Sequence, residues 1–138
     1  MNGLLVGLAI LPVTLAVPAS QPSAERVTVV VVTGAAGSVA YGRQFGTWAG
    51  RWSDAATAAG ARLIRVGSHD TDKRRDRERQ KGILEREVSR GEAELWLVLL
   101  GHGTFDGRVA KFNLRGPDVT DTEIAEWLGE CRRPTIVI

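Results

Sequence analysis

Two short apolar runs limit the folds open to this chain. "RVTVVVV" covers Arg26–Val32, and "LWLVLL" covers Leu95–Leu100. A strand with one face in water alternates apolar and polar residues, whereas these runs are apolar almost throughout, as strands covered on both faces are. Such strands belong mainly to parallel sheets that helices cover. The runs therefore predict an α/β domain around a buried sheet.

Segments with helical spacing lie between the apolar runs. After the first run we expect a loop over Thr33–Gly42, then a helix that stops at Gly60. Its apolar stripe predicts a helix face buried in the core, tryptophans included, and consists of Phe45, Trp48, Ala49, Trp52, Ala55, Ala56 and Ala59. A shorter helix is predicted within Lys81–Glu92, and Thr120 with Glu123 forms a capping box for a third.

Two more segments are predicted to complete the sheet, and one to form a hairpin or edge strand. Ala61–Val66 and Pro134–Ile138 are predicted as strands of the buried sheet, and Val109–Leu114 alternates enough to be a hairpin or edge strand. The order strand, helix, strand, helix, strand, helix predicts a mostly parallel sheet with helices on both faces. Because a buried parallel strand is expected at its very end, we interpret the chain as a fragment of a longer protein.

The N-terminus is predicted to be a signal peptide. The apolar stretch Gly3–Val17 is shorter than the roughly 20 residues of a membrane-spanning helix, and small residues follow it. We expect cleavage after Ala19 (residues 1–19) or after Ala24, leaving an exported domain, periplasmic or extracellular, over residues 26–138. No Lys or Arg precedes the stretch, so a retained membrane anchor is the alternative. The lone Cys131 has no partner for an internal disulfide.

The charge of the chain excludes one class of partner. The length of 138 residues predicts a single domain. The formal net charge of +2 is too small to indicate nucleic-acid binding. The run Asp72–Lys81 mixes acids with bases and has no aromatic residue for a base to stack on, so we predict a solvated loop or helix face. Ser68–Asp72 is interpreted as a loop and Asp106–Gly107 as a turn. Neither a metal nor a cofactor is predicted.

One glycine motif leaves an alternative function open. "VVTGAAGSVA" follows the first strand and resembles the dinucleotide-binding turn of the extended short-chain dehydrogenases. Ala40 replaces the third glycine, and the expected acid appears only at Asp70. A nucleotide-binding oxidoreductase that uses Gly34 and Gly37 is therefore an alternative.

A second motif, "LLGHGTFDG", places a histidine between two glycines where a buried strand ends. In α/β sheets this is where catalytic groups tend to lie. A strand ending in His-Gly after strand, helix, strand, helix resembles the caspase-like cysteine peptidases, most of all the legumain (hemoglobinase) group. The first loop is similar to that of the group in its arrangement of Gly34, Gly37, Tyr41 and Arg43. The resemblance covers Val27–Ile138 in element order, and the His-Gly step is its specific part.

The resemblance implies a caspase-like three-layer fold, truncated at a core strand, and a cysteine peptidase mechanism. His102 would be the catalytic base and the Gly103 N–H would stabilise the oxyanion, while Arg43 would bind an asparagine or aspartate of a peptide or protein substrate. The nucleophilic thiol is expected beyond Ile138, so the fragment alone would be inactive. Cys131 precedes the last strand and is interpreted as a structural or surface thiol. The alternative within this fold is a peptide-binding relative without a nucleophile.

Overall fold

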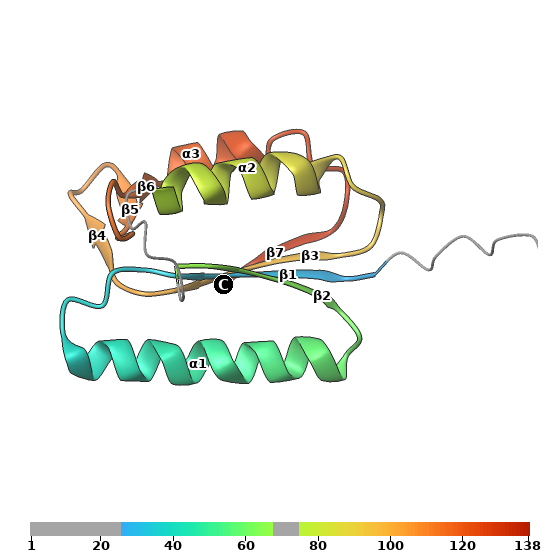
Figure 1. Cartoon of the computed structure of the whole chain (residues 1–138). Helices are drawn as coiled ribbons and strands as arrows, with labels where there is room; N and C mark the ends of the chain where they lie inside the picture. Colours follow the sequence, from blue (N-terminus) through green and yellow to red (C-terminus); the bar gives the residue numbers. More distant parts are fainter. Residues whose placement is uncertain (1–25, 68–74) are drawn as a thin grey trace, which may run out of the picture.

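The computed structural model describes residues 26–67 and 75–138, which form an α/β fold (Figure 1). The main sheet has the order β2-β1-β3-β7, and all its neighbouring strands are parallel. Its strands are β1 (Thr28–Thr33), β2 (Arg62–Val66), β3 (Leu95–Leu100) and β7 (Thr135–Val137). Helix α1 (Val39–Ala58) covers one face, and α2 (Asp76–Val88) and α3 (Asp121–Leu128) cover the other. The predicted parallel sheet with helices on both faces is confirmed.

The central strands are apolar almost throughout because both of their faces are covered. Val30, Val32 and Leu97 pack on the side of α2 and α3. The intervening residues Val31 and Val98 pack on the side of α1. Successive side chains of a strand point to opposite faces, so a strand between two helical layers needs an apolar residue at nearly every position.

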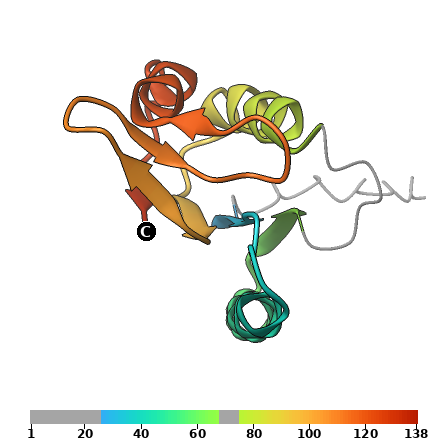
Figure 2. The same cartoon turned by 90° about the vertical axis from the view of Figure 1, so that its left-hand side faces the viewer.

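A small antiparallel sheet stands at the end of the main sheet where β3 finishes (Figures 1 and 2). Its order is β4-β5-β6, with β4 (Gly103–Phe105), β5 (Ala110–Phe112) and β6 (Val119–Thr120). The hairpin prediction for Val109–Leu114 is confirmed, whereas β4 and β6 were not predicted. In the turn, the N–H groups of Val109 and Arg108 donate to the Asp106 carboxylate and lower its pKa.

Helix α1 begins earlier than predicted. The Ser38 hydroxyl accepts a hydrogen bond from the Tyr41 N–H at 3.3 Å, so the helix starts at Val39, within the segment predicted to be a loop. Gly60, with a φ of 63°, confirms the predicted stop. The prediction of a fully buried stripe was wrong at Trp48, which is 38% exposed, and at Ala55 and Ala59, which are also exposed. Within residues 26–67 and 75–138, α1 is the sole helix on its face of the sheet (Figure 2), so no other described helix covers the flanks of the stripe.

The prediction that the charged run Asp72–Lys81 is a solvated loop or helix face was wrong in part. Helix α2 starts at Asp76, inside the run predicted to be solvated, and ends at Val88, before the predicted end. Asp76 and Gln80 are fully buried, one helical turn apart on the face toward the core. The error arose because a mixture of charges indicates exposure on average. Asp76 is instead paired with Arg115, which lies in a distant loop.

The predicted capping box at the start of α3 is confirmed. The Thr120 hydroxyl accepts from the Glu123 N–H at 3.1 Å, and the Glu123 carboxylate accepts from the Thr120 N–H at 2.9 Å. The bond from the Thr120 N–H and the pairing with Arg77 lower the pKa of Glu123. Because Arg77 belongs to α2, its contact with Glu123 also joins the two helices.

Some predictions fall outside the described residues. The signal peptide (1–19, or up to 24) and the loop Ser68–Asp72 are among them. Within residues 26–67 and 75–138, no helix has both the length and the apolar character needed to span a membrane.

Candidate functional site

His102 lies directly beyond β3, at the carboxyl edge of the main sheet. Its ring is half-buried, and Nε2 is 3.2 Å from the carbonyl oxygen of Ala36, in the loop after β1. Two rings of α1 contact the imidazole: the centroid of Tyr41 is 4.6 Å away in an edge arrangement, and that of Phe45 is 5.2 Å away. The loop and α1 therefore hold the imidazole in one orientation.

The contact with Ala36 assigns the tautomer of His102. A carbonyl oxygen accepts hydrogen bonds and cannot donate them, so a neutral imidazole bonded there carries its hydrogen on Nε2. Nδ1 then has a free lone pair and can accept a proton. This is the protonation state that a general base needs before it acts.

Gly103 is the first residue of β4, an edge strand of the small sheet. The Asn113 N–H donates to the His102 carbonyl at 2.9 Å, so His102 and Asn113 form a hydrogen-bonded pair. Such pairs alternate with non-hydrogen-bonded pairs in an antiparallel ladder, and Gly103 opposite Phe112 is of the second kind. The N–H of Gly103 therefore points away from β5, where it can donate to another group.

Two glycines at this edge make room for an aromatic ring. A Cβ at Gly101 would lie 2.9 Å from the Phe112 ring, and one at Gly34 would lie 2.4 Å from the Asn113 carbonyl oxygen. That oxygen also accepts from the Ala35 N–H at 2.8 Å. Internal packing against β5 thus accounts for Gly34 without a dinucleotide, and Asp70, the acid of that alternative, lies outside the described residues.

Substituting Gly34 should loosen this junction. We expect Gly34→Ala to lower the free energy of unfolding by about 1–3 kcal/mol, because the added methyl group overpacks against backbone. Gly50→Ala is the matched control: it lies inside α1, no atom outside its own stretch of helix is within 4 Å of the added Cβ, and it should stabilise the protein by about 0.5–1 kcal/mol. Urea denaturation followed by circular dichroism measures both. Equal effects of the two variants would contradict the close packing at Gly34.

Arg43, the predicted substrate-binding residue, is exposed in the second turn of α1. It is two residues from both Tyr41 and Phe45, so it projects from the side of the helix opposite the rings that contact His102. The structure brings Tyr41 to His102 and leaves Arg43 at the helix surface. The contact of Phe45 with His102 was missed, although its spacing of four residues from Tyr41 indicates a shared helix face.

Cys131 lies at the opposite end of the sheet from His102. It precedes β7, where its Sγ is 3.3 Å from the Thr135 Oγ1. Thr135 pairs with Leu95 at the start of β3, whereas His102 follows the end of that strand. Seven residues of extended chain span roughly 20 Å, so the thiol is out of reach of the imidazole.

Comparisons with protein-family models, curated proteins and solved structures find no match to this chain. In the part of the chain that the structure describes, no group of three or more His, Cys, Asp or Glu side chains is placed to hold a metal ion.

Proposed function

We propose that this chain supplies the base and the oxyanion donor of a legumain-like cysteine peptidase, which hydrolyses peptide bonds by thiol attack. The observation that carries the proposal is the placement of His102 at the carboxyl edge of β3, with Nε2 on the Ala36 carbonyl and Nδ1 left to accept a proton. Gly103, next in the chain, directs its N–H away from β5.

The proposed reaction uses both groups. The thiol proton moves to Nδ1 of His102, and the thiolate attacks the carbonyl carbon of the scissile peptide bond. The oxyanion that forms accepts a hydrogen bond from the Gly103 N–H. The imidazolium then returns the proton to the leaving amine as the C–N bond breaks, and water hydrolyses the remaining thioester with His102 again as base.

The register of β7 supports a nucleophile on a segment that follows Ile138. Val137 pairs with Leu97, and the Ile138 carbonyl accepts from the Leu99 N–H at 2.8 Å. Continued in this direction, the chain would run beside the last residues of β3 toward His102. A thiol within the next few residues would reach the imidazole, which Cys131 does not.

The proposed substrate is an exported peptide or protein cleaved beside asparagine or aspartate. The resemblance assigns this side chain to Arg43, but Arg43 projects from the side of α1 opposite the rings that contact His102, so a side chain next to the scissile bond would have to be bound by another group.

The test uses the protein extended beyond Ile138 and fluorogenic peptides with asparagine or aspartate before the reporter. We expect His102→Ala to lower kcat/KM by about 10²–10⁴-fold, because the proton acceptor is lost. Cys131→Ser is the matched control and should leave turnover unchanged.

Four results would overturn the proposal. Unchanged turnover in His102→Ala would exclude His102 as base. Lost turnover in Cys131→Ser would mean that Cys131 is needed for catalysis and that the nucleophile does not lie beyond Ile138. Peptide binding without any cleavage by the wild type would favour the peptide-binding relative. Calorimetric binding of a nicotinamide dinucleotide would support the oxidoreductase instead.

A further inference from the structure

Within the described residues, strand β4 has a neighbouring strand on one side only, so its other edge is open (Figure 2). The strand begins at Gly103, directly after His102. All three of its residues are exposed, and Phe105 is 69% exposed. An open edge presents N–H and C=O groups with which a second extended chain can form hydrogen bonds. The edge beside His102 is therefore suited to an extended peptide.

The ladder between β4 and β5 determines which backbone groups face this open edge. His102 forms a hydrogen-bonded pair with the opposite chain, and four residues later the Asp106 N–H donates to the Val109 carbonyl. Hydrogen-bonded and non-hydrogen-bonded pairs alternate along an antiparallel ladder, so Gly103 and Phe105 both belong to non-hydrogen-bonded pairs. Each of these two residues therefore directs its N–H and its C=O away from β5, toward the open edge.

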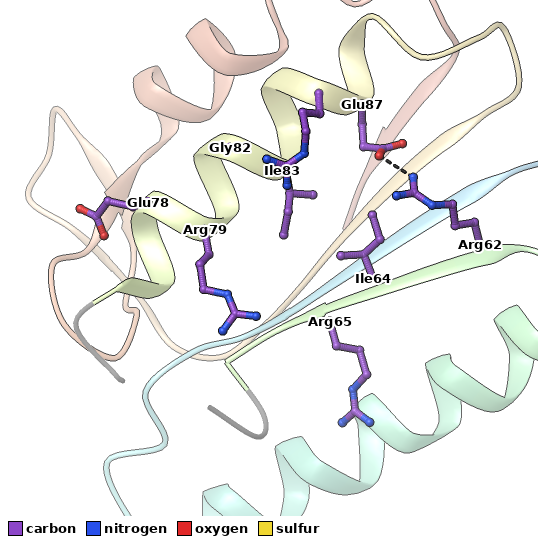
Figure 3. Close-up of a pocket in the computed structure, with 9 residues that line it drawn as sticks. Arg62, Ile64, Arg65, Glu78, Arg79, Gly82, Ile83 and Glu87 are labelled. Atoms are coloured by element: carbon purple, nitrogen blue, oxygen red, sulfur yellow. Dashed lines mark hydrogen bonds and ion pairs between the residues drawn. The ribbon is translucent and has the colours of Figure 1, made fainter. Parts of the chain in front are cut away.

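Strand β2 shows how an edge strand of this fold is protected against pairing. It is the outermost strand of the main sheet, and Arg62 and Arg65 project from its two faces (Figure 3). Arg62 is also paired with Glu87 of α2 at 2.5 Å. Charged side chains on an edge strand oppose the addition of another chain. The sequence Gly-Thr-Phe of β4 contains neither a charge nor a proline, so the strand itself does not oppose an added strand.

We propose that β4 binds the peptide substrate as an added antiparallel strand. The residue that carries the scissile carbonyl pairs with Gly103, and the residue two places before it pairs with Phe105. The Gly103 N–H donates to the scissile carbonyl, and the Gly103 carbonyl accepts from the N–H of the same substrate residue. Phe105 exchanges the same two hydrogen bonds with its own partner. The inference rests on the proposed peptidase and identifies the part of the substrate that this edge recognises.

The position of His102 favours the antiparallel direction. An antiparallel peptide runs from Phe105 to Gly103 and then continues toward His102, which precedes Gly103 in the chain. The leaving amine follows the scissile carbonyl, so it lies on the side of the imidazole that has to return a proton to it. A parallel peptide would instead carry the chain after the scissile bond toward Phe105, away from His102.

Phe105 also gives the open edge a side-chain preference. Directly opposite residues of an antiparallel pair project from the same face of a sheet, so the substrate side chain paired with Phe105 lies against its ring. Pairs of an aromatic with a β-branched side chain are among the stabilising cross-strand pairs. The substrate residue opposite Thr104 projects from the other face. We therefore expect valine to be preferred over alanine two places before the scissile residue.

Peptides with single N-methyl groups test the ladder, using the protein extended beyond Ile138. An N-methyl group two places before the scissile residue removes the N–H that donates to the Phe105 carbonyl, so kcat/KM should fall by about tenfold. An N-methyl group on the residue between is the matched control. Its N–H points away from β4, so we expect kcat/KM to change by less than about threefold.

Variants of Phe105 test the side-chain preference. In the wild type we expect kcat/KM to favour valine over alanine by about three- to fivefold, the effect of one cross-strand pair. Phe105→Ala should abolish this preference, and Phe105→Leu should retain most of it. Thr104→Ala is the matched control on the same strand, and it should leave the preference unchanged because its side chain lies on the other face. Circular dichroism checks that each variant is folded.

The results that contradict the inference differ from those that contradict the peptidase. No cleavage of any peptide by the wild type would overturn the proposed peptidase, and this inference with it. Cleavage that tolerates both N-methyl groups would leave the peptidase standing and exclude β4 as the substrate edge. Losses only from N-methyl groups after the scissile bond would exclude the antiparallel direction. A preference for valine that persists in Phe105→Ala would exclude a contact with the ring.

Discussion

Replacing Arg133 by alanine is expected to lower the free energy of unfolding by about 3–5 kcal/mol, because a buried carboxylate and several carbonyl groups lose their partner. The Arg133 side chain is 1% exposed. Its guanidinium donates to the carbonyl of Glu94 at 2.8 Å and to that of Arg90 at 3.0 Å, and it also contacts the Ala93 carbonyl. One of its nitrogens faces the Glu87 carboxylate at 3.6 Å.

Two further variants define the cause of this loss. Arg132→Ala removes the exposed neighbouring arginine and should change the free energy of unfolding by less than about 0.5 kcal/mol. Arg133→Lys keeps the charge but not the planar fork, so it should lie between wild type and Arg133→Ala. Urea denaturation followed by circular dichroism ranks the variants. Arg133→Ala as stable as Arg132→Ala would mean that the buried network contributes nothing.

Replacing Asp76 by alanine is expected to lower the free energy of unfolding by a similar amount, about 3–5 kcal/mol. Asp76 is fully buried at the start of α2, and Arg115, from the loop between β5 and β6, binds it through two hydrogen bonds of 2.7 and 2.9 Å. The pair fastens α2 to the small sheet beside His102. Without Asp76, the Arg115 side chain, which is 18% exposed, keeps a positive charge that has lost its bidentate partner.

The same denaturation experiment separates this pair from a helix-end effect. Glu78→Ala removes an exposed acid from the same first turn and should cost less than about 1 kcal/mol, which is the size of an interaction with the helix dipole. The double variant Asp76→Ala with Arg115→Ala should regain part of the stability, because the guanidinium that lost its bidentate carboxylate is then removed as well. A loss in Asp76→Ala no larger than that in Glu78→Ala would contradict the pair.

Features that depend on neighbours along the chain were predictable. The strands β1 and β3 follow from runs that are apolar almost throughout, the end of α1 from Gly60, and the start of α3 from Thr120 and Glu123. The position of His102 at a strand end is equally local. Each depends on periodicity, capping or backbone preference within a few residues, and these act before any distant contact forms.

Features that depend on residues distant along the chain could not be predicted from the sequence. Asp76 is 39 residues from Arg115, and Arg133 is 105 residues from Thr28, to whose hydroxyl it donates. Charged residues are seldom buried unless paired, and the pairing is invisible until the chain folds.

The sequence by itself therefore determined the strands of the main sheet, the three helices, their order and the place of His102 at the end of a buried strand, but not β4 and β6. The tertiary structure alone decided which charges are buried and what holds His102. The Ala36 carbonyl that orients the imidazole lies 66 residues before it. The reason is physical: local patterns specify which face of an element is apolar, but the partner of a buried polar group is chosen by the packing of whole elements.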